Sequence, residues 1–92
     1  MLTDEVKQQI IQCAKDFQVQ TVWLFGSSLD ANVDARDIDL AVEGLSPELF
    51  FKFYGRLFFD LPKPVDLVDL SENPPLTSII REKGIRIYER AA

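Results

Sequence analysis

Three aspartates in two apolar segments are the side chains best suited to chemistry. Asp37 and Asp39 lie two residues apart in the alternating segment 37–43, and Asp66 lies in the apolar run 65–68. Residues i and i+2 of a strand point to the same face, about 6.5 Å apart, so two carboxylates there repel each other. A hard divalent cation bound between the carboxylates would offset this repulsion. Mg²⁺ prefers carboxylate oxygens and keeps positions open for water and phosphate. The pattern predicts a two-ion Mg²⁺ site for in-line phosphoryl displacement.

A glycine–serine pair supplies the other half of such a site. Gly26 and Ser27 follow a β-branched and aromatic run, 21–25. Glycine lets the backbone approach a phosphate closely, and the serine amide and hydroxyl can both donate to it. A helical turn in the polar segment 28–36 would add free amides to the anion site. Gly26 and Ser27 are therefore predicted to bind the phosphates of a nucleotide.

Each feature also has an ordinary structural interpretation. A Gly-Ser pair after a strand is usually a turn, an Asp-x-Asp pair is usually a solvated strand edge, and Asp66 alone could be an ion-paired acid. The order of all three along one chain favours a catalytic site. Asp69 remains an alternative third acid, because Asp66 and Asp69 point to opposite faces of a strand and parity does not choose between them.

The composition excludes several kinds of chemistry. The 92 residues contain no histidine and one cysteine, so Ser-His and Cys-His nucleophile pairs and histidine metal ligands are ruled out. Cys13 falls on the apolar stripe of a predicted helix and is interpreted as a core thiol. The net charge of −5 argues against direct nucleic-acid binding. Cysteine usage and the lack of a membrane-spanning apolar run predict a cytoplasmic protein without membrane contact.

The hydrophobic pattern predicts one domain over residues 1–92, of the α/β (α+β) class. The expected architecture is a small mixed sheet with helices mainly on one side, in the order α-β-β-α-β-α-β. Thr3 and the Ser46-Pro47 pair are helix-start signals, and Gly84 is expected to be a left-handed C-cap. The expected strands are 21–25, 37–43, 65–70 and 85–88, and the expected helices begin near residues 4, 47 and 75.

The predicted helix 47–59 carries more apolar surface than so small a domain buries easily. A stripe on this helix is expected to face the sheet: Phe50, Phe53, Tyr54, Leu57 and Phe58. Phe51 widens the stripe, and Phe59 falls on the polar face. An exposed apolar patch indicates a homo-oligomer or a protein partner.

Taken together, these segments resemble the DNA polymerase β-like nucleotidyltransferase superfamily, above all its minimal nucleotidyltransferases. The resemblance rests on Leu24-Phe25-Gly26-Ser27, Asp37-Ile38-Asp39-Leu40 and Val65-Asp66-Leu67-Val68, and extends to the closing segment 79–88. It implies that Gly26 and Ser27 bind the triphosphate. It further implies that Asp37 and Asp39 ligate two Mg²⁺ ions, and that Asp66 binds the catalytic metal and helps to activate the incoming hydroxyl.

The resemblance also implies a substrate and a partner. Many minimal members are encoded beside an all-helical HEPN protein and act as its antitoxin, and some transfer AMP from ATP to a tyrosine of that toxin. The expected function is therefore AMP transfer from ATP to a hydroxyl of a HEPN-type partner; the alternative is a non-catalytic antitoxin that neutralises its partner by binding. Many relatives carry an Ala-Arg-Gly segment after the Gly-Ser pair, where this chain has Ser28-Leu29-Asp30-Ala31. A basic phosphate contact therefore has no counterpart there.

Overall fold

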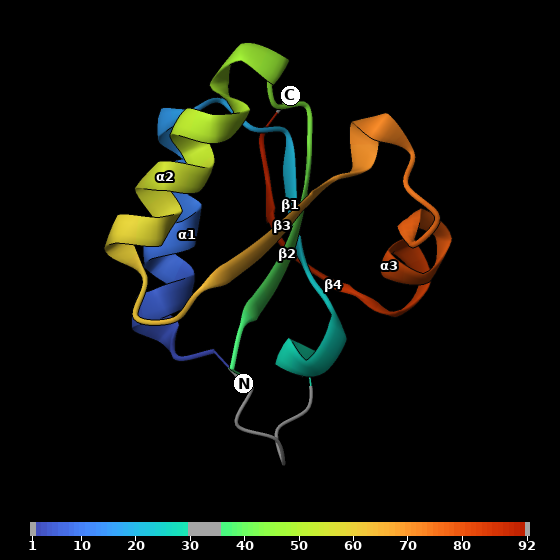
Figure 1. Cartoon of the computed structure of the whole chain (residues 1–92), viewed down its shortest axis with the longest axis horizontal. Helices are drawn as coiled ribbons and strands as arrows, with labels where there is room; N and C mark the ends of the chain where they lie inside the picture. The colour runs from blue at the N-terminus through green and yellow to red at the C-terminus, as the bar shows by residue number, and fades with distance from the viewer. Residues whose placement is uncertain (1, 30–35, 92) are drawn as a thin grey trace.

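The chain folds around a mixed β-sheet, shown in Figure 1. The computed structural model describes residues 2–29 and 36–91. Within these ranges the elements follow the predicted order α-β-β-α-β-α-β, so the predicted fold class is confirmed. They are α1 (Asp4–Asp16), β1 (Thr21–Leu24), the 3₁₀ turn η1 (Gly26–Leu29), β2 (Ile38–Glu43), the 3₁₀ turn η2 (Pro47–Leu49), α2 (Phe50–Asp60), β3 (Val65–Asp69), the 3₁₀ turn η3 (Leu70–Glu72), α3 (Thr77–Lys83) and β4 (Ile85–Glu89).

The sheet has the strand order β3-β2-β1-β4. β1 pairs antiparallel with both β2 and β4, whereas β2 pairs parallel with β3. A parallel pair needs a crossover connection, and α2 provides it. β4 lies at an edge of the sheet. In the described ranges, no helix is long and apolar enough to cross a membrane.

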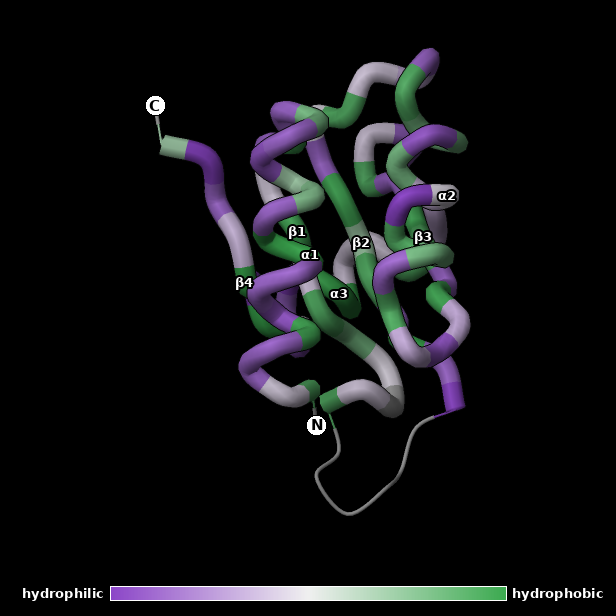
Figure 2. The backbone as a smooth tube through the Cα atoms, turned by 90° about the vertical axis from the view of Figure 1, so that its left-hand side faces the viewer, coloured by the Kyte–Doolittle hydropathy of each residue, from purple (hydrophilic) through white to green (hydrophobic). Residues whose placement is uncertain are grey.

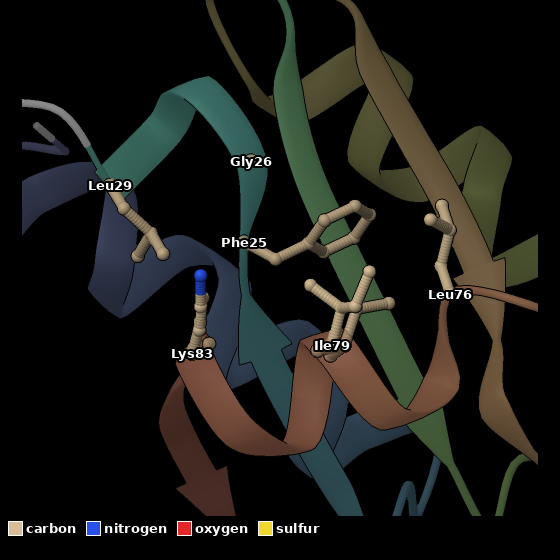
Figure 3. Close-up of a pocket in the computed structure, with 8 residues that line it drawn as sticks. Phe25, Gly26, Leu29, Leu76, Ile79 and Lys83 are labelled. Atoms are coloured by element: carbon tan, nitrogen blue, oxygen red, sulfur yellow. The ribbon is translucent and has the colours of Figure 1, made fainter.

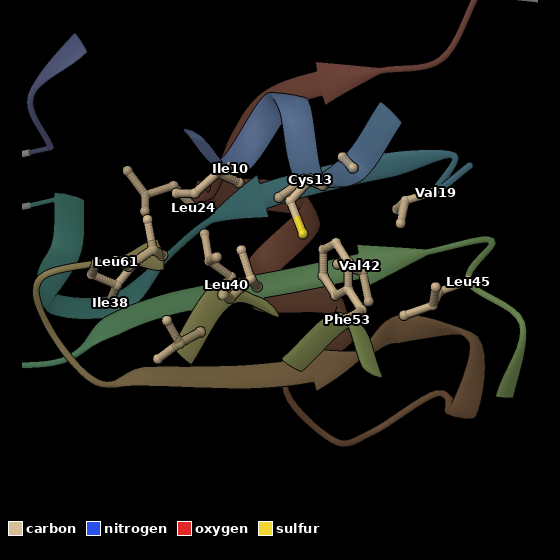
Figure 4. Close-up of a cluster of buried hydrophobic side chains, with 14 residues drawn as sticks. Ile10, Cys13, Val19, Leu24, Ile38, Leu40, Val42, Leu45, Phe53 and Leu61 are labelled. Carbon is tan, nitrogen blue, oxygen red and sulfur yellow. The ribbon is translucent and has the colours of Figure 1, made fainter. Parts of the chain in front are cut away.

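The main core lies between the sheet and the two longer helices, α1 and α2 (Figures 1 and 2). Alternate residues of β1 and β2 point into it, as the period of a strand requires. The predicted stripe of α1 is confirmed, and the Thr3 hydroxyl accepts a hydrogen bond from the Val6 amide at 3.2 Å, which caps the helix. Figure 4 shows the buried cluster, which includes Ile10, Cys13, Val22, Leu24, Leu40, Val42, Phe53 and Leu57.

The opposite face of the sheet is covered by α3. Ile80 of this helix packs with Ala41 and Leu70, and Trp23, Phe25 and Val68 border the cluster. Figure 1 shows α3 on the other side of the sheet from α1 and α2. The helices therefore lie mainly on one side, as predicted, and the second face carries a smaller apolar cluster.

The predicted role of Gly84 as a left-handed cap is wrong. Its backbone is extended, with φ −70° and ψ 163°. Glycine is required there for close approach instead, because an added Cβ would lie 2.5 Å from the carbonyl oxygen of Ile80 and 3.1 Å from that of Leu24. The end of α3 is thereby packed directly against β1.

The predicted orientation of Phe58 is also wrong. Its side chain is 59% exposed, while Phe53 and Leu57 are fully buried. Residues four apart share one side of a helix, whereas Phe58 is turned by about 100° from Leu57. The buried stripe of α2 is therefore narrower than the sequence indicated, and Phe58 joins Phe51 and Phe59 on the exposed surface.

Glu43, at the end of β2, links α3 to the sheet through hydrogen bonds and an ion pair. Its carboxylate accepts hydrogen bonds from the Thr21 hydroxyl at 2.8 Å and the Trp23 indole at 3.2 Å. It also pairs with the Arg81 guanidinium at 2.6 Å. The hydrogen bond from Arg81 is the main cause that lowers the pKa of Glu43 below its ordinary value.

This network makes a prediction about stability and pH. A carboxyl group with a lowered folded-state pKa stabilises the fold above its unfolded pKa, and the contribution is lost as the pH falls through the folded pKa. Glu43→Gln is expected to lower the free energy of unfolding by about 1 kcal/mol at pH 7, since Arg81 is half exposed. The difference from the parent should shrink below the ordinary pKa of 4.5. Urea unfolding at several pH values measures this, with Glu89→Gln as the control because Glu89 makes an exposed 3.5 Å ion pair with Arg86. Equal losses in the two variants would contradict the prediction.

Candidate active site

The parallel register of β2 and β3 places Asp39 opposite Asp66. Neighbouring strands are about 4.8 Å apart, and partners in register point to the same face. Ala41 and Val68, the partners two residues further along, pack in the cluster beneath α3. Asp39 and Asp66 therefore leave the sheet on the α3 face, where Asp39 is half-buried and Asp66 is exposed.

Gly26 brings the end of β1 against the Asp39 carboxylate. Its backbone is left-handed, with φ +65°, and a Cβ added to it would lie 2.6 Å from Asp39 Oδ2. The Phe25 amide donates to the Asp39 carbonyl at 3.1 Å, which extends the pairing of β1 and β2 by one bond. A non-glycine residue would be strained there and would displace the carboxylate. Ser27 follows within η1.

Ser28 holds this turn to the start of β2. It is 3% exposed. Its hydroxyl donates to the Asp37 carbonyl at 3.3 Å and accepts from the Asp39 amide at 3.0 Å. Sequence reasoning missed this role, because nothing in the pattern distinguishes Ser28 from the polar residues that follow. Of the segment that departs from the family pattern, residues 30 and 31 lie outside the described ranges.

The other aspartates occupy different positions. Asp37 lies one residue before β2 and is exposed. Asp69 is in register with Val42, which points into the main core, and its carboxylate caps η3 by accepting from the Ser71 amide at 2.9 Å. Of the two alternatives for the third acid, Asp66 therefore shares the face of Asp39, and Asp69 has a local structural role.

Within residues 2–29 and 36–91, no three acidic or cysteine side chains lie close enough together to hold a metal ion. Mg²⁺ is usually bound by one or two carboxylates together with waters and substrate phosphates, rather than by a cage made of protein alone. The in-register carboxylates of Asp39 and Asp66 fit that pattern.

Cys13 is excluded as a nucleophile. It is a free thiol in the main core, as predicted. Burial raises its pKa to about 11, so the thiol stays protonated at neutral pH. Because the thiolate is the reactive form, Cys13 has a packing role only.

Comparison with protein families identifies the fold. A family model described as "Polymerase beta, Nucleotidyltransferase" matches residues 8–92. The chain belongs to this nucleotidyltransferase family. Comparison with curated proteins finds no significant match.

Solved structures similar to this nucleotidyltransferase chain include toxin–antitoxin complexes. One, described as a toxin–antitoxin with AMP-PNP, is 25% identical, with a TM-score of 0.74 over 91% of this chain and 73% of that chain. A second, the toxin–antitoxin MntA-HepT, is 23% identical, with a TM-score of 0.72 over 96% of this chain and 74% of that chain. A third is the tri-AMPylated Shewanella oneidensis HEPN toxin in complex with MNT antitoxin; it is 24% identical, with a TM-score of 0.73 over 97% and 74%.

Two glycine substitutions with opposite expected effects test the turn at the site. Gly26→Ala should lower the free energy of unfolding by about 1–2 kcal/mol, because alanine is strained at a positive φ. Gly55 lies in the middle of α2, and beyond its chain neighbours and the adjacent helix backbone no atom lies within 4 Å of an added Cβ. Gly55→Ala should therefore raise stability by about 0.5–1 kcal/mol through helix propensity. Chemical denaturation of both variants measures the difference, and a stabilising Gly26→Ala would contradict the left-handed turn.

Proposed function

We propose that this chain is a Mg²⁺-dependent adenylyltransferase that moves AMP from ATP to a hydroxyl group of a partner protein. The observation that carries the proposal is the register of β2 and β3, which sets Asp39 beside Asp66, together with the contact of Gly26 on Asp39. Folding alone gains nothing from two like charges on neighbouring strands. A cation bound between them, together with a triphosphate, would reverse the repulsion.

Each residue has a distinct part in the proposed reaction. Asp37, Asp39 and Asp66 would hold two Mg²⁺ ions, which would neutralise the negative charge of the triphosphate. Gly26 and Ser27 donate their amides to the phosphate oxygens. The acceptor oxygen forms a bond to the α-phosphorus, the bond from that phosphorus to the bridging oxygen breaks, and pyrophosphate leaves. Asp66, which is more exposed than its register partner Asp39, receives the proton of the incoming hydroxyl.

The partner is proposed to be a HEPN-type protein that the chain counteracts as an antitoxin. Similar solved structures include an MNT antitoxin in complex with a tri-AMPylated HEPN toxin. The chain also has an exposed apolar surface on α2, made by Phe51, Phe58 and Phe59, which are 82%, 59% and 86% exposed. Large exposed apolar groups of this kind mark protein contacts. The buried free thiol of Cys13 agrees with a reducing compartment, and we place the reaction in the cytoplasm.

Label transfer from ATP tests the acids. Asp39→Asn and Asp66→Asn should each reduce transfer of label from [α-³²P]ATP to the purified partner by about 100-fold or more, because electrostatic stabilisation of the phosphoryl group is lost. Removal of Mg²⁺ by EDTA should abolish transfer. Asp69→Asn is the matched control: it changes a carboxylate of the same strand that caps η3. Undiminished transfer by Asp39→Asn, or an equal loss in Asp69→Asn, would refute the assignment.

A non-catalytic antitoxin is the second candidate. It is favoured by the departure at Ser28-Leu29, where relatives of the resembled family carry a basic phosphate contact. In that case the Asp39→Asn/Asp66→Asn double variant should neutralise the partner as well as the parent chain does. For an enzyme, the double variant should fail to neutralise while still binding the partner.

A further inference from the structure

A cavity of about 250 Å³ opens between α3 and the segment that joins β1 to η1. It is lined by Phe25, Gly26, Leu29, Leu76, Ile79, Ile80, Lys83 and Gly84. Figure 3 shows the ring of Phe25 above Ile79, with Lys83 rising beside Leu29. The cavity is slightly below the usual size range of small-molecule sites, which is about 300–1,000 Å³.

This cavity adjoins the proposed phosphate site through a single residue. Gly26 lines the cavity, and the position of its missing Cβ lies 2.6 Å from Asp39 Oδ2. A ligand whose phosphates lie at Gly26 and Asp39 would therefore reach this cavity across Gly26. The two sites are continuous across one glycine.

The lining suits a flat apolar ring. Leu76 and Ile79 are 48% and 54% exposed. Leu76 immediately precedes α3, and Figure 3 shows Ile79, within α3, below the ring of Phe25. Such side chains gain little from folding while they remain in water, but a planar heteroaromatic ring laid on Phe25 would cover them. Bases stack on such surfaces because every base has a π-face.

Lys83 adds a positive charge to the lining of the cavity. Its ammonium group can only donate hydrogen bonds, and it suits the acceptor oxygens of a ribose or phosphate. The chain has Ser28-Leu29 where a basic phosphate contact is expected from the resemblance. Lys83 is a positively charged residue in the lining of the cavity, which Gly26 also lines.

We infer that this cavity is the subsite for the nucleobase of the triphosphate, with Phe25 and Ile79 as its walls and Lys83 at the ribose–phosphate end. The inference rests on the proposed function, since it takes the phosphates to lie at Gly26 and Asp39. It goes beyond that proposal by assigning α3, which carries none of the three proposed metal-binding aspartates, to substrate binding.

Equilibrium binding measurements distinguish the contribution of the base to the affinity from that of the phosphates. The Mg²⁺ complexes of ATP and of inorganic tripolyphosphate are titrated into the full chain in a calorimeter. ATP is expected to bind about 5- to 150-fold more tightly than tripolyphosphate, the gain from stacking one base. Ile79→Asn should remove most of this gain and leave tripolyphosphate binding unchanged, and Leu76→Asn should act in the same direction.

Ile85→Asn is the matched control for Ile79→Asn. Ile85 is 48% exposed, so the two isoleucines differ little in burial. It pairs with Leu24, whose side chain lies in the main core, and therefore points to the opposite face of the sheet from the cavity. Circular dichroism of the three variants checks that each is folded. The control should keep the full preference for ATP.

The outcomes separate the two proposals. Equal affinity of the parent for ATP and tripolyphosphate, or a preference that survives both Ile79→Asn and Leu76→Asn, would overturn the base subsite and leave the phosphate site intact. Binding of neither compound would overturn the proposed function, and the subsite with it. Loss of the preference in Ile85→Asn as well would also overturn the assignment of the cavity.

Discussion

Two carboxylates on neighbouring strands repel each other, yet the register of β2 and β3 holds Asp39 opposite Asp66. The apolar residues on the other face of the same strands maintain this register. Ile38 pairs with Val65 and Leu40 with Leu67, and these side chains pack in the core beneath α1 and α2. A slip of one residue would turn the apolar set toward α3 and the acids into the core, so burial of apolar surface outweighs the repulsion. The proposed site therefore depends on the core.

The same face of the sheet carries acids in two different settings. At the far end of β2, Glu43 is held by Thr21, Trp23 and Arg81, an arrangement that stabilises the fold. At the near end, the backbone turns at Gly26 and the Ser28 hydroxyl bridges two backbone groups, so that the end of β1 lies against Asp39. The first arrangement links α3 to the sheet. The second brings Asp39 and Asp66 to the glycine turn at which the phosphates are proposed to bind.

The elements and their order could be predicted from the sequence, because α1 follows the helical period and β2 alternates. The sequence could not predict which acid of β3 shares a face with Asp39. Asp66 and Asp69 point to opposite faces, and only the register of β3 against β2 shows that Asp66 lies on the face of Asp39. Two predictions, for Gly84 and Phe58, were wrong because tertiary contacts determine the role of each residue. Gly84 is needed for the approach of α3 to β1 rather than for its φ, and Phe58 is exposed because only one narrow side of α2 is buried. Ser28 was missed because its partners are backbone groups of another segment.

The central claim is that Asp39 and Asp66 bind a divalent cation together, at the glycine turn. The most direct measurement is a crystal structure of the chain with Mn²⁺ and a non-hydrolysable ATP analogue, in which anomalous scattering locates the metal. The account predicts an ion bound by carboxylate oxygens of Asp39 and Asp66, with phosphate oxygens next to Gly26. An ion bound elsewhere, or a nucleotide whose phosphates lie away from these two side chains, would contradict it.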